Sequence, residues 1–175
     1  MKLRKVQQDA LDVWLSVRKG TLSMCTGSGK SRIFVEILKT KPYKNVLLVV
    51  PTEKLRDSNW KEEFEKWDAE KLYDSLDRCC YASINKKTLS DYDLICLDES
   101  HNITNNRIEQ LSEYKGDILS LTATFPSKEH DEEKHSLLSS IAPEIFKYTL
   151  EQGVEEGVVA PYNITVYYIP LTLAA

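Results

Sequence analysis

The sequence predicts an α/β fold in three layers (α/β/α), with helices on both sides of a mostly parallel central sheet. Apolar strand segments alternate with amphipathic helical segments along most of the chain, which is the pattern of helices packed on a sheet. The run Val46–Val50 is apolar at every position, as expected of a strand covered on both faces. A loop containing Gly27 and Gly29 joins a short strand to a helix, which is half of a βαβ unit.

Length and composition indicate one globular domain. The chain has 175 residues, 42% of them hydrophobic and 29% charged, which suffices for one core and is not the composition of a disordered or fibrous protein. No apolar run reaches the roughly 18 residues of a membrane span, and the N-terminus lacks the apolar stretch of a signal peptide. We therefore expect a cytoplasmic protein with no membrane partner. The net charge of −4 argues against a surface coated with basic residues for nucleic acid.

The individual elements follow from periodicity. Val6, Ala10, Trp14 and Val17 recur at helical spacing, which predicts an opening helix over residues 5–17 that ends at Gly20. Further helices are expected over residues 30–39, 52–70, 107–113 and 127–140. Strands are expected over residues 21–24, 45–50, 79–83, 94–97, 118–122, 145–149 and 162–169. The four cysteines form no CxxC pair, so we expect reduced thiols.

Residues 25–31, Cys-Thr-Gly-Ser-Gly-Lys-Ser, supply the parts of a phosphate-binding loop. The glycines let backbone N–H groups approach phosphates, and the N-terminus of the following helix adds its dipole. Lys30 is placed to reach the β and γ phosphates, and the Ser31 hydroxyl to bind Mg²⁺. The strict pattern has a glycine where this chain has Met24. Because a strand and a helix flank the loop, we expect a nucleotide site there.

The apolar strand over residues 94–97 ends abruptly in two carboxylates, Asp98 and Glu99. Adjacent acids at a buried edge are costly unless a positive group meets them, and ligands of open α/β sheets bind beyond the carboxyl ends of the strands. Asp98 is expected to hold Mg²⁺ directly or through water. Glu99 is expected to orient the attacking water and to help deprotonate it.

The order of several motifs resembles that of a known family. Residues 98–101, Asp-Glu-Ser-His, resemble the DEAH-type box of superfamily 2 helicases and translocases, in which the glycine missing at Met24 is often absent. Residues 3–10 resemble the LRxYQxxA segment before the phosphate loop, and residues 49–52 with Leu55 and Trp60 resemble motif Ia. Residues 81–83 and 120–124 resemble motifs Ib and III. The chain is thus similar to the N-terminal RecA-like ATP-binding lobe of DEAD/DEAH-type helicases, a group that includes type III restriction enzymes.

The resemblance implies a P-loop NTPase of RecA type over residues 1–170, with 171–175 starting a linker to a second lobe or foreign to the protein. It implies ATP and Mg²⁺ as cofactors, catalytic roles for Lys30, Asp98 and Glu99, and metal binding by Ser31 and Asp98. It places nucleotide contacts on Gln7, with Gln8 as the alternative, and on Thr26, Gly27, Ser28, Gly29, Lys30 and Ser31. It places nucleic-acid contacts on Pro51, Thr52, Arg56 and Ser83, and coupling of ATP to nucleic acid on His101, Thr122 and Thr124.

The implied function is that of an ATP-dependent nucleic-acid helicase or translocase, contacting the nucleic-acid backbone without sequence preference, with DNA favoured over RNA. A complete motor closes two lobes around ATP, and the second lobe supplies an arginine finger worth about 10³- to 10⁵-fold in rate. No arginine follows Arg107 in this chain. We therefore expect an ATP hydrolase of helicase type whose first lobe alone is weakly active or inactive. Two alternatives are a P-loop nucleotide-binding switch or phosphotransferase without nucleic-acid activity, and a non-hydrolysing binding module derived from a helicase lobe.

Overall fold

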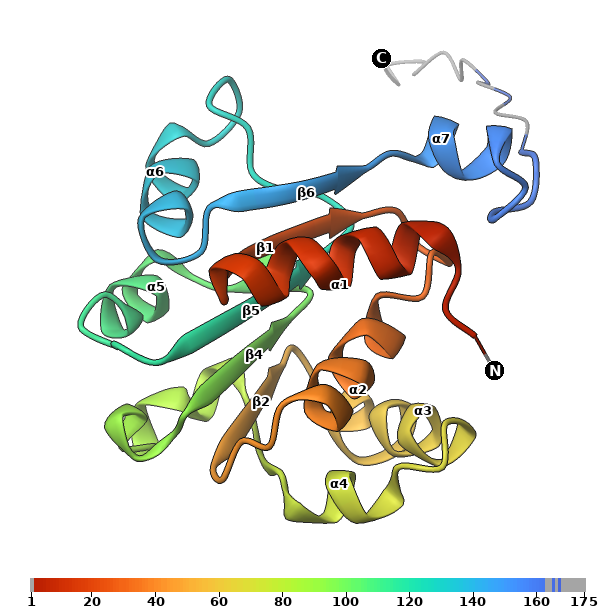
Figure 1. Cartoon of the computed structure of the whole chain (residues 1–175). Coiled ribbons are helices and arrows are strands. Elements are labelled where there is room, and N and C mark those ends of the chain that lie inside the picture. Colours follow the sequence, from red (N-terminus) through yellow and green to blue (C-terminus); the bar gives the residue numbers. More distant parts are fainter. Residues whose placement is uncertain (1, 163–164, 166, 168–175) are drawn as a thin grey trace, which may run out of the picture.

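The computed structural model describes residues 2–162, 165 and 167, and it contains a six-stranded sheet of order β3-β2-β4-β5-β1-β6 (Figure 1). Every strand pairing in this sheet is parallel. The strands are β1 (Lys19–Met24), β2 (Val46–Val50), β3 (Asp77–Cys80), β4 (Leu94–Asp98), β5 (Asp117–Thr122) and β6 (Glu144–Tyr148). The predicted fold class is therefore confirmed.

Seven α-helices accompany the sheet within the described residues: α1 (Lys5–Val17), α2 (Lys30–Thr40), α3 (Trp60–Lys66), α4 (Glu70–Ser75), α5 (Asn105–Leu111), α6 (Glu132–Ile141) and α7 (Leu150–Glu155). Four further turns are not α-helical: the π-helical turn η1 (Leu55–Asn59) and the 3₁₀ turns η2 (Tyr81–Lys86), η3 (Leu89–Asp91) and η4 (Ser100–Asn102).

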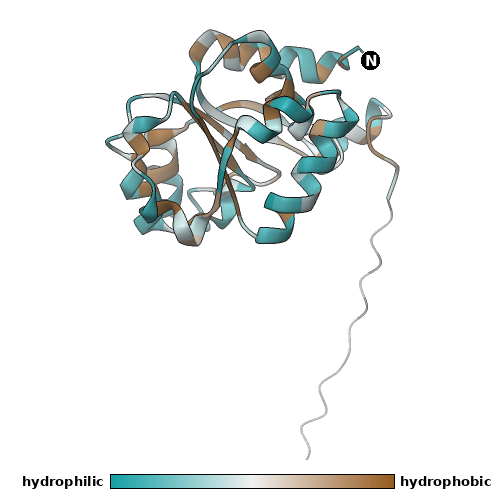
Figure 2. Cartoon of the chain, turned by 90° about the horizontal axis from the view of Figure 1, so that it is seen from below, coloured by the Kyte–Doolittle hydropathy of each residue, from teal (hydrophilic) through white to brown (hydrophobic). Residues whose placement is uncertain are grey.

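The sheet separates two hydrophobic cores. Helices α1 to α4 supply the first core, and α5, α6 and η2 supply the second. Strand residues alternate between the two: Leu48 faces the first core, whereas its neighbour Leu47 faces the second. Figure 2 shows strands coloured mainly as hydrophobic between helices that carry both hydrophilic and hydrophobic residues. This alternation of buried side chains on both faces is the reason why β2 reads as a continuous apolar run.

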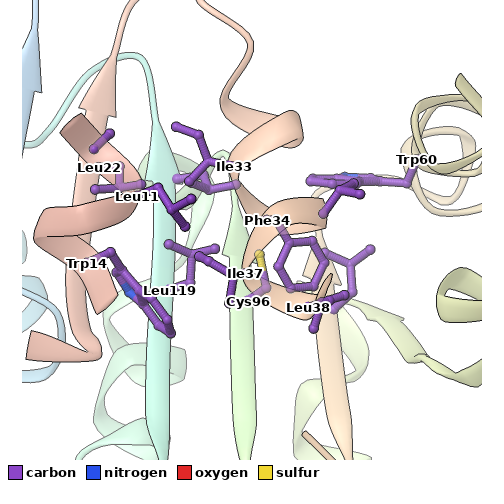
Figure 3. Close-up of a cluster of buried hydrophobic side chains, with 14 of the residues drawn as sticks. Leu11, Trp14, Leu22, Ile33, Phe34, Ile37, Leu38, Trp60, Cys96 and Leu119 are labelled. Atoms are coloured by element: carbon purple, nitrogen blue, oxygen red, sulfur yellow. The ribbon is translucent and has the colours of Figure 1, made fainter. Parts of the chain in front are cut away.

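In the first core, α1 is fixed against the sheet by Trp14. Its side chain is fully buried, and its indole Nε1 donates a hydrogen bond to the Ile118 carbonyl of β5 at 3.0 Å. Figure 3 shows Trp14 and Leu11 in one buried cluster with Leu119. Because a buried indole N–H without an acceptor would be costly, this bond sets how α1 lies on β5.

Helices α2, α3 and α4 are joined by an aromatic cluster. Phe34 of α2 packs edge-to-face on Trp60 and on Phe64 of α3, with ring centroids 5.5 and 6.0 Å apart. Phe64 also contacts Tyr73 of α4 at 5.5 Å. Figure 3 shows Phe34, Leu38 and Trp60 meeting over the sheet. Such aromatic pairs add about 0.5–1.5 kcal/mol each beyond the burial of their surface, so this cluster fixes α3 next to α2.

The prediction of a single helix over residues 52–70 is wrong. The chain forms the π turn η1, then the short helix α3, and then α4. Asp68 ends α3 in the left-handed conformation, with φ of 51°, which aspartate tolerates better than most residues because its short side chain can hydrogen-bond locally. The Tyr73 hydroxyl donates to the Arg56 carbonyl, so a long-range contact satisfies a backbone group of the π turn.

Other boundaries also shift. The strand predicted over 79–83 corresponds to β3, which starts earlier, at Asp77, and ends at Cys80. It ends there because the chain enters the 3₁₀ turn η2 at Tyr81, whose hydroxyl donates to the Asp98 carbonyl at 2.8 Å. The helix predicted over 127–140 begins only at Glu132, where the Asp131 side chain accepts the Lys134 N–H as an N-cap. The helix over 107–113 is α5 and the strand over 145–149 is β6. The strand predicted over 162–169 lies largely outside the described residues.

All four cysteines are free thiols in the structure, and three of them are buried. Across the described residues, no helix combines the length and the apolar character that crossing a membrane would require.

Replacing Phe64 with alanine tests the aromatic cluster. The side chain is fully buried, so its removal should lower the free energy of unfolding by about 3–5 kcal/mol. Urea denaturation followed by circular dichroism measures the change, and Lys61→Ala, an exposed position on the same helix, should shift the midpoint little. A loss below about 1 kcal/mol would mean that α3 is held by contacts other than this cluster.

Candidate functional site

The carboxyl ends of β1 and β4 place the predicted phosphate loop and the two acids at one edge of the sheet. β5 lies between these strands, so that Asp98 at the end of β4 pairs with Leu121, and Leu121 pairs with Leu22 of β1. An open cavity of about 700 Å³ lies at this edge. Its lining combines residues of the N-terminal segment, the phosphate loop, the acid pair and α3, among them Arg4, Gln7, Gly27, Gly29, Lys30, Ser31, Trp60, Glu63, Trp67, Asp98 and Glu99.

The loop has the backbone geometry of an anion-binding turn. Gly27 and Gly29 have φ of 83° and 86°, a region that side-chain-bearing residues rarely adopt. The buried Ser28 folds the loop on itself, because its hydroxyl donates to the Cys25 carbonyl at 2.7 Å. Gly29 is the N-cap of α2, and the first turn of this helix lines the cavity with the end that carries the positive side of the helix dipole. Thr26 lies in the same turn and is exposed.

Lys30 extends back under this loop. Its ammonium donates to the Met24 carbonyl at 2.9 Å and lies 3.5 Å from the Cys25 carbonyl. Burial lowers the pKa of Lys30, and the carboxylates of Glu99 and Asp98 oppose that shift. A partly desolvated ammonium between a phosphate-loop backbone and two acids is suited to hold an anion.

Gln7 connects α1 to the loop. Its amide Nε2 donates to the Ser28 carbonyl at 3.1 Å, and its Oε1 accepts the Arg4 N–H at 3.0 Å. A Cβ at Gly29 would lie only 2.3 Å from Gln7 Nε2, so the two elements meet closely. Gln8, in contrast, is exposed and bonds Asp12 on the outer face of α1. Of the two glutamines, the geometry therefore brings Gln7 to the loop.

Asp98 is almost completely buried and is held by a tryptophan. Its Oδ2 accepts the indole N–H of Trp60 at 2.7 Å. Burial raises the pKa of the Asp98 carboxyl to about 6; the bond from Trp60 lowers that pKa, and the neighbouring Glu99 raises it. The carboxylate is thus a costly charge in this position unless a cation faces it.

Glu99 adopts a left-handed backbone conformation with φ of 47°, which is uncommon for residues other than glycine. This turn directs the chain into η4 and leaves the carboxylate at the cavity wall. Its Oε2 lies 3.3 Å from His101 Nδ1. Strained backbone of this kind persists only where the surroundings enforce it, and it is frequent at functional sites.

The three residues expected to couple the two sites lie together. His101 Nδ1 is 3.0 Å from Thr122 Oγ1, and Thr122 Oγ1 in turn contacts the backbone N–H of Thr124 at 3.1 Å. Because the same His101 nitrogen lies near Glu99, a chain of polar contacts runs from the acid pair to the end of β5. Beneath it, the Ser120 hydroxyl donates to the buried Ser100 hydroxyl at 2.8 Å.

The residues expected to contact nucleic acid lie beyond the carboxyl ends of β2 and β3. Pro51 and Thr52 follow β2 directly, and Ser83 lies in η2 after β3. Arg56 lies in the π turn, where its guanidinium makes two hydrogen bonds to Asp57, at 2.7 and 2.8 Å. The structure thus brings these residues to the sheet edge that carries the cavity, farther along the row of strands.

Sequence reasoning missed the contribution of α3 to the site. It named Trp60 only as part of the segment that resembles motif Ia and gave Glu63 no role, yet both line the cavity. The Ser31 hydroxyl donates to Glu63 Oε2 at 2.9 Å. Trp60 and Glu63 are three residues apart on one helix and therefore face the same way, which is the signal that could have found them.

Comparisons with known proteins agree with this picture. Residues 1–81 match the family described as type III restriction enzyme, res subunit. A curated relative, the DNA 3'-5' translocase XPB2 of Sulfurisphaera tokodaii, is 25% identical over an alignment of 187 residues that covers 98% of this chain and 41% of the relative. The chain therefore spans about two fifths of that relative's length.

Among solved structures, the Hef helicase domain of Pyrococcus furiosus has a TM-score of 0.63 and 21% sequence identity, covering 83% of this chain and 37% of that one. This likeness concerns the fold. The chain thus has the same fold as that helicase domain, and its sequence is similar to a DNA translocase and, over residues 1–81, to the type III restriction enzyme res subunit.

Proposed function

We propose that the chain is the ATP-binding first lobe of a DNA helicase or translocase. The observation that carries this proposal is one cavity in which a glycine-bearing loop with Lys30 faces the acids Asp98 and Glu99, while Gln7 is bonded to the loop. The relative named as a DNA translocase supports the class of activity and favours DNA over RNA. Because the chain spans only part of that relative, the activity of the whole motor is part of the proposal.

The residues present fit ATP with Mg²⁺. The left-handed glycines and the start of α2 offer N–H groups to phosphate oxygens, and Lys30 offers a cation. Ser31 and Asp98 offer the hard oxygen ligands that Mg²⁺ prefers. The described residues contain no cluster of three or more His, Cys, Asp or Glu side chains suited to a metal. Mg²⁺ bound with nucleotide needs no such cluster, because phosphates and waters supply most of its ligands.

Within this arrangement each residue has a distinct task. When bound, Mg²⁺ would neutralise charge on the phosphates as it does in other phosphoryl-transfer sites. Gln7 presents its amide group beside the loop, where it would read the adenine edge. Glu99, at the cavity wall, would orient a water and accept its proton. His101, near both Glu99 and Thr122, would transmit the state of the nucleotide site towards Thr124.

The nucleic-acid side is proposed at Pro51, Thr52, Arg56 and Ser83. These positions offer hydroxyls, backbone N–H groups and one guanidinium, which suit phosphates rather than base edges. A second RecA-like lobe, outside residues 1–170, would close over the ATP and supply the arginine finger. Without it, the rate of hydrolysis should be lower by about 10³- to 10⁵-fold, so we propose that this lobe alone turns ATP over slowly if at all.

Replacing Lys30 with alanine tests the nucleotide site. Loss of the ammonium should weaken Mg-ATP binding about 10- to 100-fold, because charge-assisted hydrogen bonds contribute roughly 1.5–3 kcal/mol. Titration calorimetry, with and without a single-stranded DNA oligonucleotide, measures the effect. The exposed Lys44→Ala is the matched control. Equal ATP affinity in both variants would refute the nucleotide site. The DNA oligonucleotide should strengthen ATP binding by the parent protein; if it does not, the proposal is reduced to a nucleotide-binding switch.

Replacing Asp98 with asparagine tests the cost of the buried acid. The pKa of Asp98 is raised to about 6, so the folded protein binds this proton more tightly than the unfolded chain. The stability that the proton confers is therefore present at low pH and lost as the pH rises through about 6. Asp98→Asn should stabilise the lobe at pH 7.5 by about 1–3 kcal/mol, and it should differ little from the parent only near and below the ordinary aspartate pKa of 3.8, at which the unfolded chain also binds the proton.

Thermal unfolding at the two pH values measures this effect, with the exposed Glu53→Gln as the control. If the asparagine variant is no more stable than the parent at pH 7.5, Asp98 carries no desolvation cost. Stabilisation of equal size at both pH values would mean that the gain is unrelated to the ionisation of Asp98.

The pair formed by Arg56 and Asp57 gives a test of the nucleic-acid surface. Asp57 occupies the guanidinium with two hydrogen bonds, so Asp57→Asn should free Arg56 and tighten DNA binding, whereas Arg56→Ala should weaken it. The slope of log affinity against log salt should fall by about one for Arg56→Ala. Filter binding over a series of salt concentrations checks this, with Lys44→Ala, before β2 at the opposite edge, as the control. Unchanged binding in both variants would remove this turn from the DNA surface.

A further inference from the structure

We infer that Glu63 is a positioning residue for the metal-binding hydroxyl of Ser31, so that helix α3 is a third component of the Mg-ATP site beside the phosphate loop and the acid strand. The inference rests on the proposed function, because it concerns how Ser31 would meet Mg²⁺. It starts from the hydrogen bond that the Ser31 hydroxyl donates to Glu63 Oε2 at 2.9 Å.

The Glu63 carboxylate is held in place from two other directions. The indole Nε1 of Trp67 lies 3.4 Å from the same Oε2, and the ammonium of Lys66 lies 3.6 Å from Oε1. About two thirds of the Glu63 side chain is buried, since its exposed fraction is 31%. A carboxylate fixed by neighbours on both oxygens presents a stationary acceptor to Ser31, rather than one that moves freely in water.

The chemistry of a hydroxyl explains why an acceptor matters here. Serine Oγ carries one hydrogen and two lone pairs, and a cation can be bound only through a lone pair. If the hydrogen pointed into the cavity, it would face the cation and oppose its binding. By accepting that hydrogen, Glu63 turns the lone pairs of Ser31 towards the cavity. A negatively charged acceptor also makes the hydroxyl oxygen a better ligand, as second-shell partners of metal ligands do.

Asp98, the acid proposed to hold the metal together with Ser31, has a different partner on α3. Asp98 Oδ2 accepts the indole N–H of Trp60 at 2.7 Å, and among the described residues the hydroxyl of Ser31 donates to Glu63 and not to Asp98. Trp60 and Glu63 lie one turn apart on α3. One helix therefore supplies a partner to each of the two side chains proposed to hold the metal.

The packing of α3 makes this arrangement rigid. Trp60 and Phe64, on either side of Glu63 in the sequence, both contact Phe34 of α2, the helix that begins with Lys30 and Ser31. The spacing between Ser31 and Glu63 is thus fixed by buried aromatic contacts between α2 and α3.

The test measures how much Mg²⁺ improves ATP binding, as the ratio of ATP dissociation constants in EDTA and in Mg²⁺, by titration calorimetry. Glu63→Gln and Glu63→Ala should each reduce this ratio, by about tenfold for alanine and by less for glutamine, whose amide oxygen can still accept. Binding of ATP in EDTA should not weaken. Glu62→Gln removes the same charge from the same cavity wall without touching Ser31, so it should leave the ratio near that of the parent.

A double-mutant cycle shows whether Glu63 acts through Ser31. In the Ser31→Ala background, Glu63→Gln should cause no further loss of the Mg²⁺ ratio, because the two side chains form one unit. Additive losses, or equal losses for Glu62→Gln and Glu63→Gln, would reduce Glu63 to a general electrostatic influence and overturn the inference. An unchanged ratio in both Glu63 variants would also overturn it while leaving ATP binding intact. If the parent protein bound no ATP, the proposed function itself would fail.

Discussion

The parallel pairing of every strand in the described sheet is the constraint on which the rest of the structure depends. Parallel strands bring all their carboxyl ends to one edge of the sheet, so segments that are far apart in the sequence become neighbours there. The loop after β1, the acids after β4 and the turn after β5 become neighbours for this reason. Parallel pairing in turn requires helices on both faces, which explains the two separate cores and the strands that are apolar throughout.

Helix α3 stands between the two proposed binding surfaces. Its N-terminal end continues directly from the π turn that holds Arg56, and its inner face bonds Asp98 through Trp60 and Ser31 through Glu63. A π turn stores an extra residue per turn and is frequent at functional sites. If this segment contacts DNA as proposed, a shift of it would reach the proposed metal ligands through one short helix, in parallel with the contact between His101 and Thr122.

The sequence was sufficient for the fold class and for the elements that carry the phosphate loop and the acid pair, because periodicity and strand ends are local properties. It failed where distant contacts decide the local structure. Segment 52–70 is interrupted at Asp68, which has a left-handed backbone, and it contains a π turn in which the Arg56 carbonyl accepts a hydrogen bond from Tyr73. Helical spacing of apolar residues predicts neither feature. Glu63 was missed for a related reason: its partner, Ser31, is 32 residues away and on another helix. The roles of the individual site residues remain proposals.

The placement of the three tryptophans has a practical consequence. Trp14 is sealed beneath α1 against β5, whereas Trp60 and Trp67 form part of the cavity wall. Trp60 donates a hydrogen bond to Asp98, a carboxylate whose pKa burial raises to about 6, and the guanidinium of Arg32 lies 3.8 Å from the ring centroid of Trp67. Indole emission responds to nearby charge and water. Ligand binding in the cavity should therefore change the fluorescence of Trp60 and Trp67, while the emission of the buried Trp14 stays constant. Binding can thus be followed by intrinsic fluorescence without an attached dye.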